Sequence, residues 1–266
     1  RFSVVLDKKV LTKAKNLKFI LCNATGIDHI DQVFAEKLGI QIISLKNQPL
    51  YLKKITASSE LSWALIQSIT RKIPFAFEDV KNNRWERERF LGMQLSGKNI
   101  GILGMGRNGK LVSKYALSFG MKIHFYDQRD IKTNKNFFKH DSLISLLKEI
   151  DILSIHLPLN DNTVNLLNYK VLKNLKKGSF IINTSRGEII NEEDLISLLD
   201  SGYIKAAALD VISDEKNFKR NKLIKYSNKN KNLLITPHIG GATYDSWANT
   251  ENFVVDKLIE KLKNDN

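Results

Sequence analysis

A glycine-rich turn is the first place where residue types and spacing predict chemistry. Gly104, Gly106 and Gly109 form the pattern G-x-G-x-x-G, directly after an apolar run of strand length and before a segment of helical period. In this setting the first glycine permits a tight turn, the second lets the backbone approach a pyrophosphate, and the third lets helix and strand pack closely. The helix then offers unpaired N–H groups to phosphates. The pattern predicts a dinucleotide-binding site, and a structural turn without a ligand is the alternative.

Asp127 adds the second part of this prediction. It ends the next predicted strand, about 20 residues after the glycines, where an acidic side chain binds the ribose hydroxyls of NAD. A carboxylate at this position also repels the additional 2′-phosphate of NADP. The sequence therefore predicts NAD as the cofactor, while the nearby cation of Arg129 works against this preference. An ordinary aspartate at the end of a strand is the alternative interpretation.

These residues need alternating strands and helices to position them, and the alternation runs along the whole chain. Apolar runs of strand length alternate with segments of helical period, which is typical of parallel α/β architecture. We expect strands at 19–22, 40–45, 100–103, 122–126, 152–157, 180–183, 204–209 and 233–236. We expect helices at 30–38, at 57–71 where Pro74 ends the segment, at 107–119, at 142–148 behind Asp141 as N-cap, at 192–199 behind Asn191, and at 246–263.

A polar, charge-dense stretch at 81–89 interrupts this alternation, so we expect a domain boundary between 72 and 96. The predicted organisation is a smaller domain that begins with residues 1–72, a nucleotide-binding domain at 73–239, and a C-terminal helix at 240–266 that returns to the smaller domain. The predicted fold class is α/β, with a Rossmann-type doubly wound parallel sheet and a smaller flavodoxin-like α/β domain for the substrate.

The composition limits the class of protein. The chain of 266 residues is 42% hydrophobic and 26% charged, which is ordinary for a globular protein. Its formal charge of +14 suggests nucleic-acid binding, but the lysines are spread along the chain and no basic block is interleaved with aromatic residues. We therefore expect a solvated surface that weakly attracts small anions, and no nucleic-acid partner. No apolar run approaches the ~18 residues of a membrane span. The single Cys22 fits a cytoplasmic protein without disulfides.

Three later segments resemble a known family. Residues 182–187 (Ile-Asn-Thr-Ser-Arg-Gly), 209–211 (Leu-Asp-Val) and 236–241 (Thr-Pro-His-Ile-Gly-Gly) are similar, in order and spacing, to motifs of the D-isomer-specific 2-hydroxyacid dehydrogenases. Residues 26–31 and 156–163 extend the resemblance over essentially the whole chain. It implies an NAD-dependent oxidoreductase, without a metal, that transfers a hydride between NAD(H) and a small anionic 2-hydroxy or 2-oxo acid.

By this resemblance, Arg186 would hold the carboxylate and the 2-oxygen of the substrate, His238 would be the acid/base, and Glu215 would pair with His238. A guanidinium is a permanently charged fork suited to a carboxylate, and an imidazole can take a proton from a hydroxyl group near neutral pH. Without the resemblance, the alternative interpretation of these residues is a surface arginine, a loop histidine and a solvated glutamate. Family members usually have proline after this glutamate, whereas Lys216 follows it here.

The resemblance also implies the other site residues. Asp210 would contact the nicotinamide carboxamide, while Thr184 and Pro158 would line the cofactor cleft. The backbone of Thr25 and Gly26 would bind the substrate carboxylate, although Gly26 also fits a simple turn. The predicted cofactor-binding residues are Gly104, Gly106, Arg107, Asn108, Gly109, Asp127, His156, Pro158, Thr163, Thr184, Asp210, His238 and Gly240. The predicted substrate-binding residues are Thr25, Gly26, Arg186 and His238.

The helix at 57–71 resembles the one with which family members form homodimers, so a homodimer is expected. The family's smaller domain usually starts with a strand and a helix that would precede Arg1, so we expect this domain to lack its N-terminal strand. The link at 46–54 is also longer than in some subgroups of the family. A nucleotide-sensing or corepressor-type binding protein and an inactive truncated remnant are the alternatives to an enzyme. A formate dehydrogenase is disfavoured because that group carries glutamine at the position of Glu215.

Overall fold

The structure of the chain, a computed structural model, describes residues 4–133 and 135–264. The chain divides into two compact units, the first formed by residues up to Ala57 together with those from Gly241 onward, and the second by Ser58–Gly240. This division falls after the first residue of the helix α4 (Ala57–Thr70), which was predicted to belong to the smaller domain. The reason lies in its packing, because Trp63 and Ile66 of α4 belong to a core cluster of the second unit.

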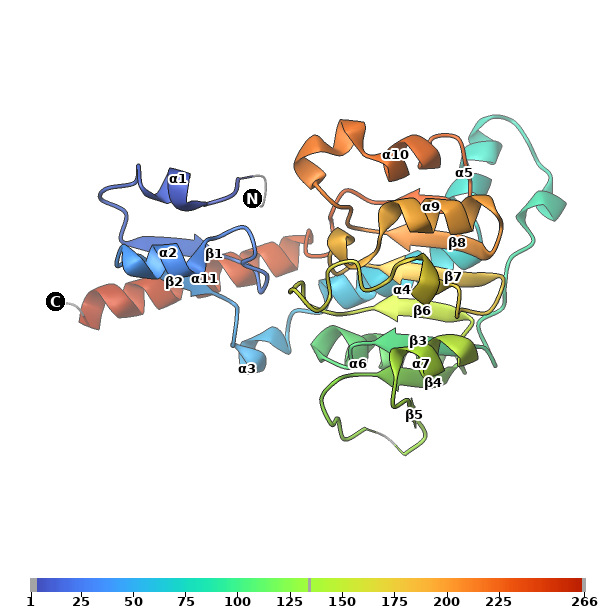
Figure 1. The fold of residues 1–266 in the computed structure, drawn as a ribbon, viewed down its shortest axis with the longest axis horizontal. Coiled ribbons are helices and arrows are strands. Elements are labelled where there is room, and N and C mark those ends of the chain that lie inside the picture. Colours follow the sequence, from blue (N-terminus) through green and yellow to red (C-terminus); the bar gives the residue numbers. More distant parts are fainter. Residues whose placement is uncertain (1–3, 134, 265–266) are drawn as a thin grey trace. The chain divides into compact units, whose positions relative to one another are not determined.

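The second unit is built on a parallel sheet of seven strands, with the order β5-β4-β3-β6-β7-β8-β9 (Figure 1). The chain runs outward from β3 through β4 to β5, and then returns to place β6 on the other side of β3. This is the doubly wound order, in which dinucleotides bind at the carboxyl ends of the two strands where the direction reverses. The strands are β3 (Asn99–Leu103), β4 (Lys122–Tyr126), β5 (Phe138–Lys139), β6 (Ile152–Ile155), β7 (Ser179–Asn183), β8 (Ile204–Leu209) and β9 (Leu233–Ile235).

Both faces of this sheet are buried. The helices α7 (Leu143–Glu149) and α9 (Glu192–Asp200), which lie in front of the strands in Figure 1, share a core cluster with Leu103 of β3. On the other face, α4 and α6 (Arg107–Ser118) share a cluster with Ile102, the neighbouring residue of the same strand. Successive side chains of a strand point to opposite faces, so a strand covered on both sides is apolar at nearly every position.

The first unit has a small parallel sheet of its own, in which β1 (Phe19–Cys22) pairs with β2 (Gln41–Ser44). Its core joins Leu11, Ile20, Ile27, Ile30, Ala35 and Ile40. The long C-terminal helix contributes as well, because the ring of Phe253 lies 4.2 Å from that of Tyr51 between ring centroids. The helices of this unit are α1 (Lys8–Leu11), α2 (Gln32–Lys37), α3 (Pro49–Leu52) and α11 (Tyr244–Asn264).

Several local predictions were wrong, each for a physical reason. Pro74 does not end the helical region but stands in the first turn of a further helix, α5 (Ile73–Lys81), where a missing N–H costs nothing. Pro49 begins the short helix α3 inside the long link at 46–54, for which no helix was predicted. The N-cap of α7 is Ser142 rather than Asp141, because its hydroxyl accepts the N–H of Ser145 at 3.1 Å. The other short helices are η1 (Arg87–Phe90), α8 (Tyr169–Leu172), η2 (Gly187–Ile189), η3 (Glu215–Arg220) and α10 (Lys222–Ser227).

Candidate functional site

The three glycines after β3 have different surroundings. A Cβ on Gly104, whose φ is +95°, would lie 2.7 Å from the carbonyl oxygen of His156, and a Cβ on Gly109 would lie 2.2 Å from the carbonyl oxygen of Gly104. The packing of the protein therefore requires both. Among the described residues other than its neighbours in the chain, a Cβ on Gly106 would meet only the Nη2 atom of Arg129, at 4.0 Å. The fold itself does not need a glycine at 106, so the open backbone there suits a phosphate group that approaches from outside.

The helix α6 begins directly behind this opening, with Gly106 as its N-cap. The first N–H groups of a helix have no partner within it, and the helix dipole favours an anion in front of them. Asn108 is fixed in this first turn because its Oδ1 accepts the hydroxyl of Ser59, from α4, at 3.1 Å. Burial lowers the pKa of the Arg107 guanidinium, which stays charged. These residues fit the pyrophosphate of a dinucleotide.

Asp127 follows β4, beside the same turn. Its Oδ2 accepts the backbone N–H of Met105 at 2.9 Å, so the carboxylate is tied to the glycine-rich turn itself. Its other partner is Arg129, whose guanidinium reaches both carboxylate oxygens at 3.0 Å. Desolvation by burial raises the pKa of Asp127, but the hydrogen bonds and charge of Arg129 outweigh it and lower that pKa overall. The carboxylate is therefore ionised, and the sequence analysis did not foresee that Arg129 occupies it.

The segment after β6 lies beside the glycine-rich turn, where the carbonyl oxygen of His156 faces Gly104. His156 contacts the hydroxyl of Ser154 through Nε2 at 2.8 Å, and desolvation lowers its pKa to about 4, so the ring is neutral at physiological pH. The buried Thr163 closes the following loop, because its hydroxyl donates to the carbonyl of Pro158 and accepts the N–H of Asn160, both at 2.8 Å. Pro158 itself is exposed.

Arg186 lies in the turn after β7. The carboxamide of Asn183 shapes this turn, because its Oδ1 accepts the N–H of Ser185 at 3.0 Å and its Nδ2 donates to the carbonyl of Arg186 at 2.8 Å. A Cβ on Gly187 would lie 2.0 Å from the carbonyl carbon of Ile212, so only glycine lets this turn touch the segment that follows β8. Thr184, in the same turn, shares a 2.6 Å hydrogen bond with Ser62 of α4.

The buried Asp210, at the end of β8, organises the loop that follows β9. Its carboxylate accepts the hydroxyl of Thr236 at 2.6 Å, the N–H of Ile239 at 2.9 Å and the N–H of Gly240 at 2.7 Å. Desolvation by burial raises the pKa of Asp210 in spite of these bonds. His238 lies in the middle of the loop with φ +54°, a left-handed conformation that is unusual for a residue with a side chain. This positioning role of Asp210 was not predicted from the sequence.

His238 and Glu215 form a pair, with 2.9 Å between Nδ1 and Oε2. The hydrogen bond that His238 donates to Glu215 raises the pKa of His238, although desolvation and the positive charge of Arg186 work in the opposite direction. Glu215 begins η3 directly after Asp214, whose left-handed φ of +52° turns the chain, so Lys216 in place of the family's proline does not prevent the pair. The predicted acid/base and its partner are therefore within hydrogen-bond distance, close enough to Arg186 for its charge to act on the imidazole.

The site residues of the second unit thus follow adjacent strands. Gly104, Asp127 and His156 come after β3, β4 and β6, whereas Arg186 and His238 come after β7 and β9, with Glu215 after β8 between them. Thr25 and Gly26 belong to the first unit, where they follow β1, and their part in substrate binding stays a prediction.

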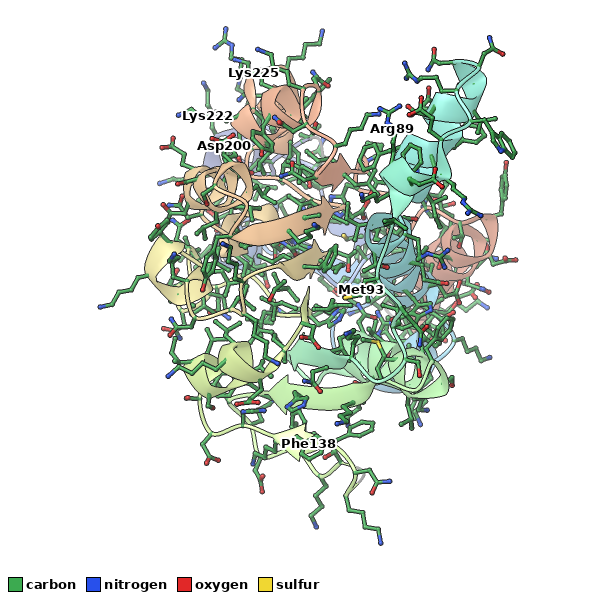
Figure 2. The ribbon with its side chains drawn as sticks, turned by 90° about the vertical axis from the view of Figure 1, so that its right-hand side faces the viewer. Arg89, Met93, Phe138, Asp200, Lys222 and Lys225 are labelled. Carbon is green, nitrogen blue, oxygen red and sulfur yellow. The ribbon has the colours of Figure 1, made fainter. Side chains whose placement is uncertain are left out.

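A hollow of the second unit lies away from this site. It encloses about 800 Å³ and is lined by Gly178 and Gly202, which precede β7 and β8, so it lies at the opposite end of the sheet from the glycine-rich turn. Arg89 and Met93, labelled in Figure 2, line it from the segment before β3. Within 4–133 and 135–264, no group of three or more His, Cys, Asp or Glu residues is arranged to hold a metal. No helix in the same ranges is long and apolar enough to cross a membrane.

Comparison with known proteins covers both units. A family model described as "D-isomer specific 2-hydroxyacid dehydrogenase, NAD binding domain" matches residues 63–240, and the model for the catalytic domain of the same family matches residues 2–57. The glyoxylate reductase of Thermococcus litoralis is 35% identical, over 97% of this chain and 78% of its own length. The hydroxypyruvate reductase of Thermotoga maritima is 33% identical, over 98% of this chain and 83% of its own.

A solved structure agrees in fold. The D-lactate dehydrogenase of Aquifex aeolicus, complexed with NAD and lactic acid, has a TM-score of 0.83 and is 28% identical, over 98% of this chain and 81% of that one. The parallel sheets and the glycine-rich turn described above are therefore those of a known group of nucleotide-dependent enzymes.

Proposed function

The chain belongs to the D-isomer specific 2-hydroxyacid dehydrogenase family, and we propose that it reduces a small 2-oxo acid of the size of glyoxylate or hydroxypyruvate with NADH. It is an NAD-dependent oxidoreductase by its family, and the choice of substrate follows the two reductases to which it is similar. The observation that carries the proposed chemistry is the 2.9 Å pair of His238 and Glu215, on a loop fixed by Asp210 and within the electrostatic reach of Arg186.

Arg186 would bind the carboxylate and the 2-oxygen of the substrate. Its guanidinium carries a permanent charge and several N–H groups in one plane, which suits an anionic acid better than a single ammonium group does. The turn around it is rigid, because Asn183 binds its backbone and Gly187 locks the turn against Ile212. A substrate held at both groups loses most of its rotational freedom before the reaction, which is the entropic part of catalysis.

His238 would move the proton. NAD(H), when bound, supplies or accepts the hydride at C2. In reduction, protonated His238 gives its proton to the 2-oxygen, and in oxidation the neutral ring takes the proton from the hydroxyl group. Glu215 holds Nδ1, so the proton would pass through the other ring nitrogen, and the negative charge of Glu215 stabilises the imidazolium.

The dinucleotide would lie across the carboxyl ends of β3 and β6. Gly104, Gly106 and Gly109, with Arg107 and Asn108 of the first helical turn, would hold the pyrophosphate, and Asp127 the adenosine ribose. His156, Pro158, Thr163 and Thr184 would line the nicotinamide side, together with Asp210, His238 and Gly240. What supports these assignments is the open backbone at Gly106 and the position of each residue after a strand on the same edge of the sheet.

We also propose a homodimer, through α5 rather than through α4. The apolar side chains of α4 are committed to the core of the second unit, whereas Phe77 and Val80 of α5 are exposed by 62% and 51%, and Trp85 beyond the helix by 88%. Exposed apolar side chains gathered on one segment mark an interaction surface. Light scattering should give a dimer mass for the wild type and a smaller mass for Phe77→Ser. A monomeric wild type would contradict this.

The experiment that tests the function is a panel of 2-oxo acids assayed by NADH absorbance, with wild type and His238→Gln compared. We expect glyoxylate and hydroxypyruvate to be reduced faster than acids with bulky side chains. The variant should lose turnover in both directions while it retains NADH binding, measured by fluorescence titration. NADH binding without turnover of any acid by the wild type would contradict the proposal and favour a nucleotide-sensing protein.

A further inference from the structure

We infer that Arg129 sets the cofactor selectivity of this protein, because its guanidinium occupies the carboxylate that should bind the ribose of NAD and offers a cation to the 2′-phosphate of NADP. The inference rests on the dinucleotide site of the proposed function, but not on its substrate or its proton transfer. It predicts that NADPH binds nearly as well as NADH, although Asp127 taken alone predicts selectivity for NADH.

The hydrogen bonds of Asp127 leave little room for a ribose. An ionised carboxylate has about four acceptor positions, two on each oxygen. Oδ1 accepts the backbone N–H and the Nε–H of Arg129, at 2.9 and 3.0 Å. Oδ2 accepts the N–H of Met105 at 2.9 Å and the Nη2–H of Arg129 at 3.0 Å. A ribose hydroxyl can therefore donate to this carboxylate only after the Arg129 side chain has withdrawn.

The same pair removes the electrostatic reason for excluding NADP. The charge of Arg129 neutralises the carboxylate at 3.0 Å, so an incoming 2′-phosphate no longer meets a net negative charge. Arginine has five N–H donors, and its planar fork is suited to phosphate oxygens. Only Nε–H and one Nη2–H of Arg129 are engaged with Asp127, so further donors of the same group remain available to a phosphate.

The location of the guanidinium matches this role. A Cβ built on Gly106 would have Arg129 Nη2 4.0 Å away, so the cation lies beside the turn where the pyrophosphate is expected. The side chain of Arg129 is 67% exposed, whereas that of Asp127 is 7% exposed. Because exposed ion pairs contribute little to stability, the Arg129 side chain can turn into solvent with little loss of free energy. The carboxylate of Asp127 is buried and stays beside the turn.

The test is equilibrium binding rather than turnover. NADH and NADPH are titrated separately, with cofactor fluorescence as the readout, into wild type, Arg129→Gln, Asp127→Asn and Arg87→Gln. Arg87→Gln is the matched control, because Arg87 is also an exposed arginine paired with a nearby carboxylate, that of Glu88 at 3.0 Å, but belongs to η1. Thermal unfolding of each variant shows whether it is folded.

For the wild type we expect dissociation constants for NADH and NADPH that differ by less than about tenfold. Arg129→Gln should bind NADH two- to fivefold more tightly, which corresponds to at most about 1 kcal/mol, and NADPH at least tenfold more weakly. Added salt should weaken NADPH binding in the wild type more than in this variant. Asp127→Asn, which frees the arginine, should weaken NADH binding and leave NADPH binding unchanged or tighter. The control variant Arg87→Gln should have the same ratio of NADH to NADPH dissociation constants as the wild type.

Two results would overturn the inference. The first is an Arg129→Gln variant in which both affinities change by the same factor, or neither changes, since a merely structural arginine would not alter the ratio. The second is a wild type that binds NADH more than a hundredfold more tightly than NADPH. If Arg129→Gln is unfolded, the Asp127→Asn variant distinguishes the two possibilities. A purely structural role for the pair of Asp127 and Arg129 would weaken the binding of both NADH and NADPH in that variant. None of these measurements depends on His238 or Arg186, so a failure of the proposed catalysis would be seen separately.

Discussion

Asp210 holds His238 from the backbone: its carbonyl oxygen accepts the N–H of His238 at 2.9 Å, while its carboxylate binds the two residues that follow the histidine. The imidazole itself is turned toward Glu215. Two acidic residues therefore fix the same histidine in different ways, one through the conformation of its loop and the other through its ring. This separation of roles allows them to be distinguished by mutation.

Asp210→Asn should damage the loop. The substitution places an NH₂ group where a carboxylate oxygen accepts a backbone N–H, so one buried donor loses its partner, which costs about 2 kcal/mol in the free energy of unfolding. We expect denaturant unfolding to show this loss and kcat/KM to fall, because His238 no longer keeps its position. Wild-type stability with reduced activity would instead indicate a direct contact of Asp210 with the cofactor.

Glu215→Gln should change the pH dependence rather than the fold. The hydrogen bond between His238 and Glu215 raises the pKa of His238, so the charged imidazolium persists to higher pH in the wild type. Reduction needs this protonated form, and the variant's reduction rate should therefore begin to fall at a lower pH than that of the wild type. Rates of reduction and oxidation measured from about pH 5 to 10 should show both limbs moving in the same direction.

The same pair makes a prediction about stability. The raised pKa of His238 stabilises the folded state below the ordinary histidine value of about 6.5, and this contribution is lost as the pH rises through the folded value. The difference in melting temperature between wild type and Glu215→Gln should therefore be largest at acidic pH and shrink above neutrality. A difference that is independent of pH would show that the pair does not titrate.

Arg186→Lys should impair substrate use more than cofactor binding. A lysine keeps the charge but cannot offer two parallel N–H groups, so we expect kcat/KM for the 2-oxo acid to fall by about 3 kcal/mol, or roughly 100-fold. The dissociation constant for NADH should change by less than about threefold, since this arginine is predicted to contact the substrate. An Arg186→Ala variant with nearly intact turnover would contradict the proposed orientation of the substrate.

Gly106→Ala and Gly109→Ala form a matched pair of variants. An added methyl group at 109 would lie 2.2 Å from a backbone oxygen, so this variant should lose several kcal/mol of stability. At 106 the nearest atom to the methyl group, within the described part of the chain and beyond its two neighbours, is 4.0 Å away, so the melting temperature should stay within about 2 °C of the wild type. The cofactor should nevertheless bind at least tenfold more weakly to Gly106→Ala, because the methyl group occupies the approach to the backbone. Equal cofactor affinity in Gly106→Ala and wild type would argue against a pyrophosphate at this turn.

Much of the fold could be predicted because its signals are local. The period of apolar residues marks β3, β4 and β8, and the Asn191 side chain caps α9 as expected, since its oxygen accepts the N–H of Asp194. The parts that were missed depend on contacts between distant segments. Nothing near Pro74 in the sequence shows that α5 follows it, because a proline is equally compatible with the end of one helix and the first turn of another.

The candidate site shows the same limit. The residue types of Arg186, Glu215 and His238 could be assigned by resemblance, but the left-handed backbone of His238 and the three donors around Asp210 could not. A carboxylate that binds a loop and one that binds a ligand have the same sequence signal. Only the hydrogen-bond partners distinguish them, and these come from segments more than 20 residues apart.

The order of the strands has a consequence for how such a protein can diversify. The nucleotide is expected over β4, β3 and β6, while the proton-transfer and anion-binding residues follow β7, β8 and β9. Each half of the sheet can therefore accumulate substitutions in its own loops while the backbone of the other half stays fixed. Changes in cofactor preference, at Asp127 and Arg129, and changes in substrate, around Arg186, are physically separable. One scaffold of this kind can give rise to enzymes that pair different acids with different nucleotides in any combination.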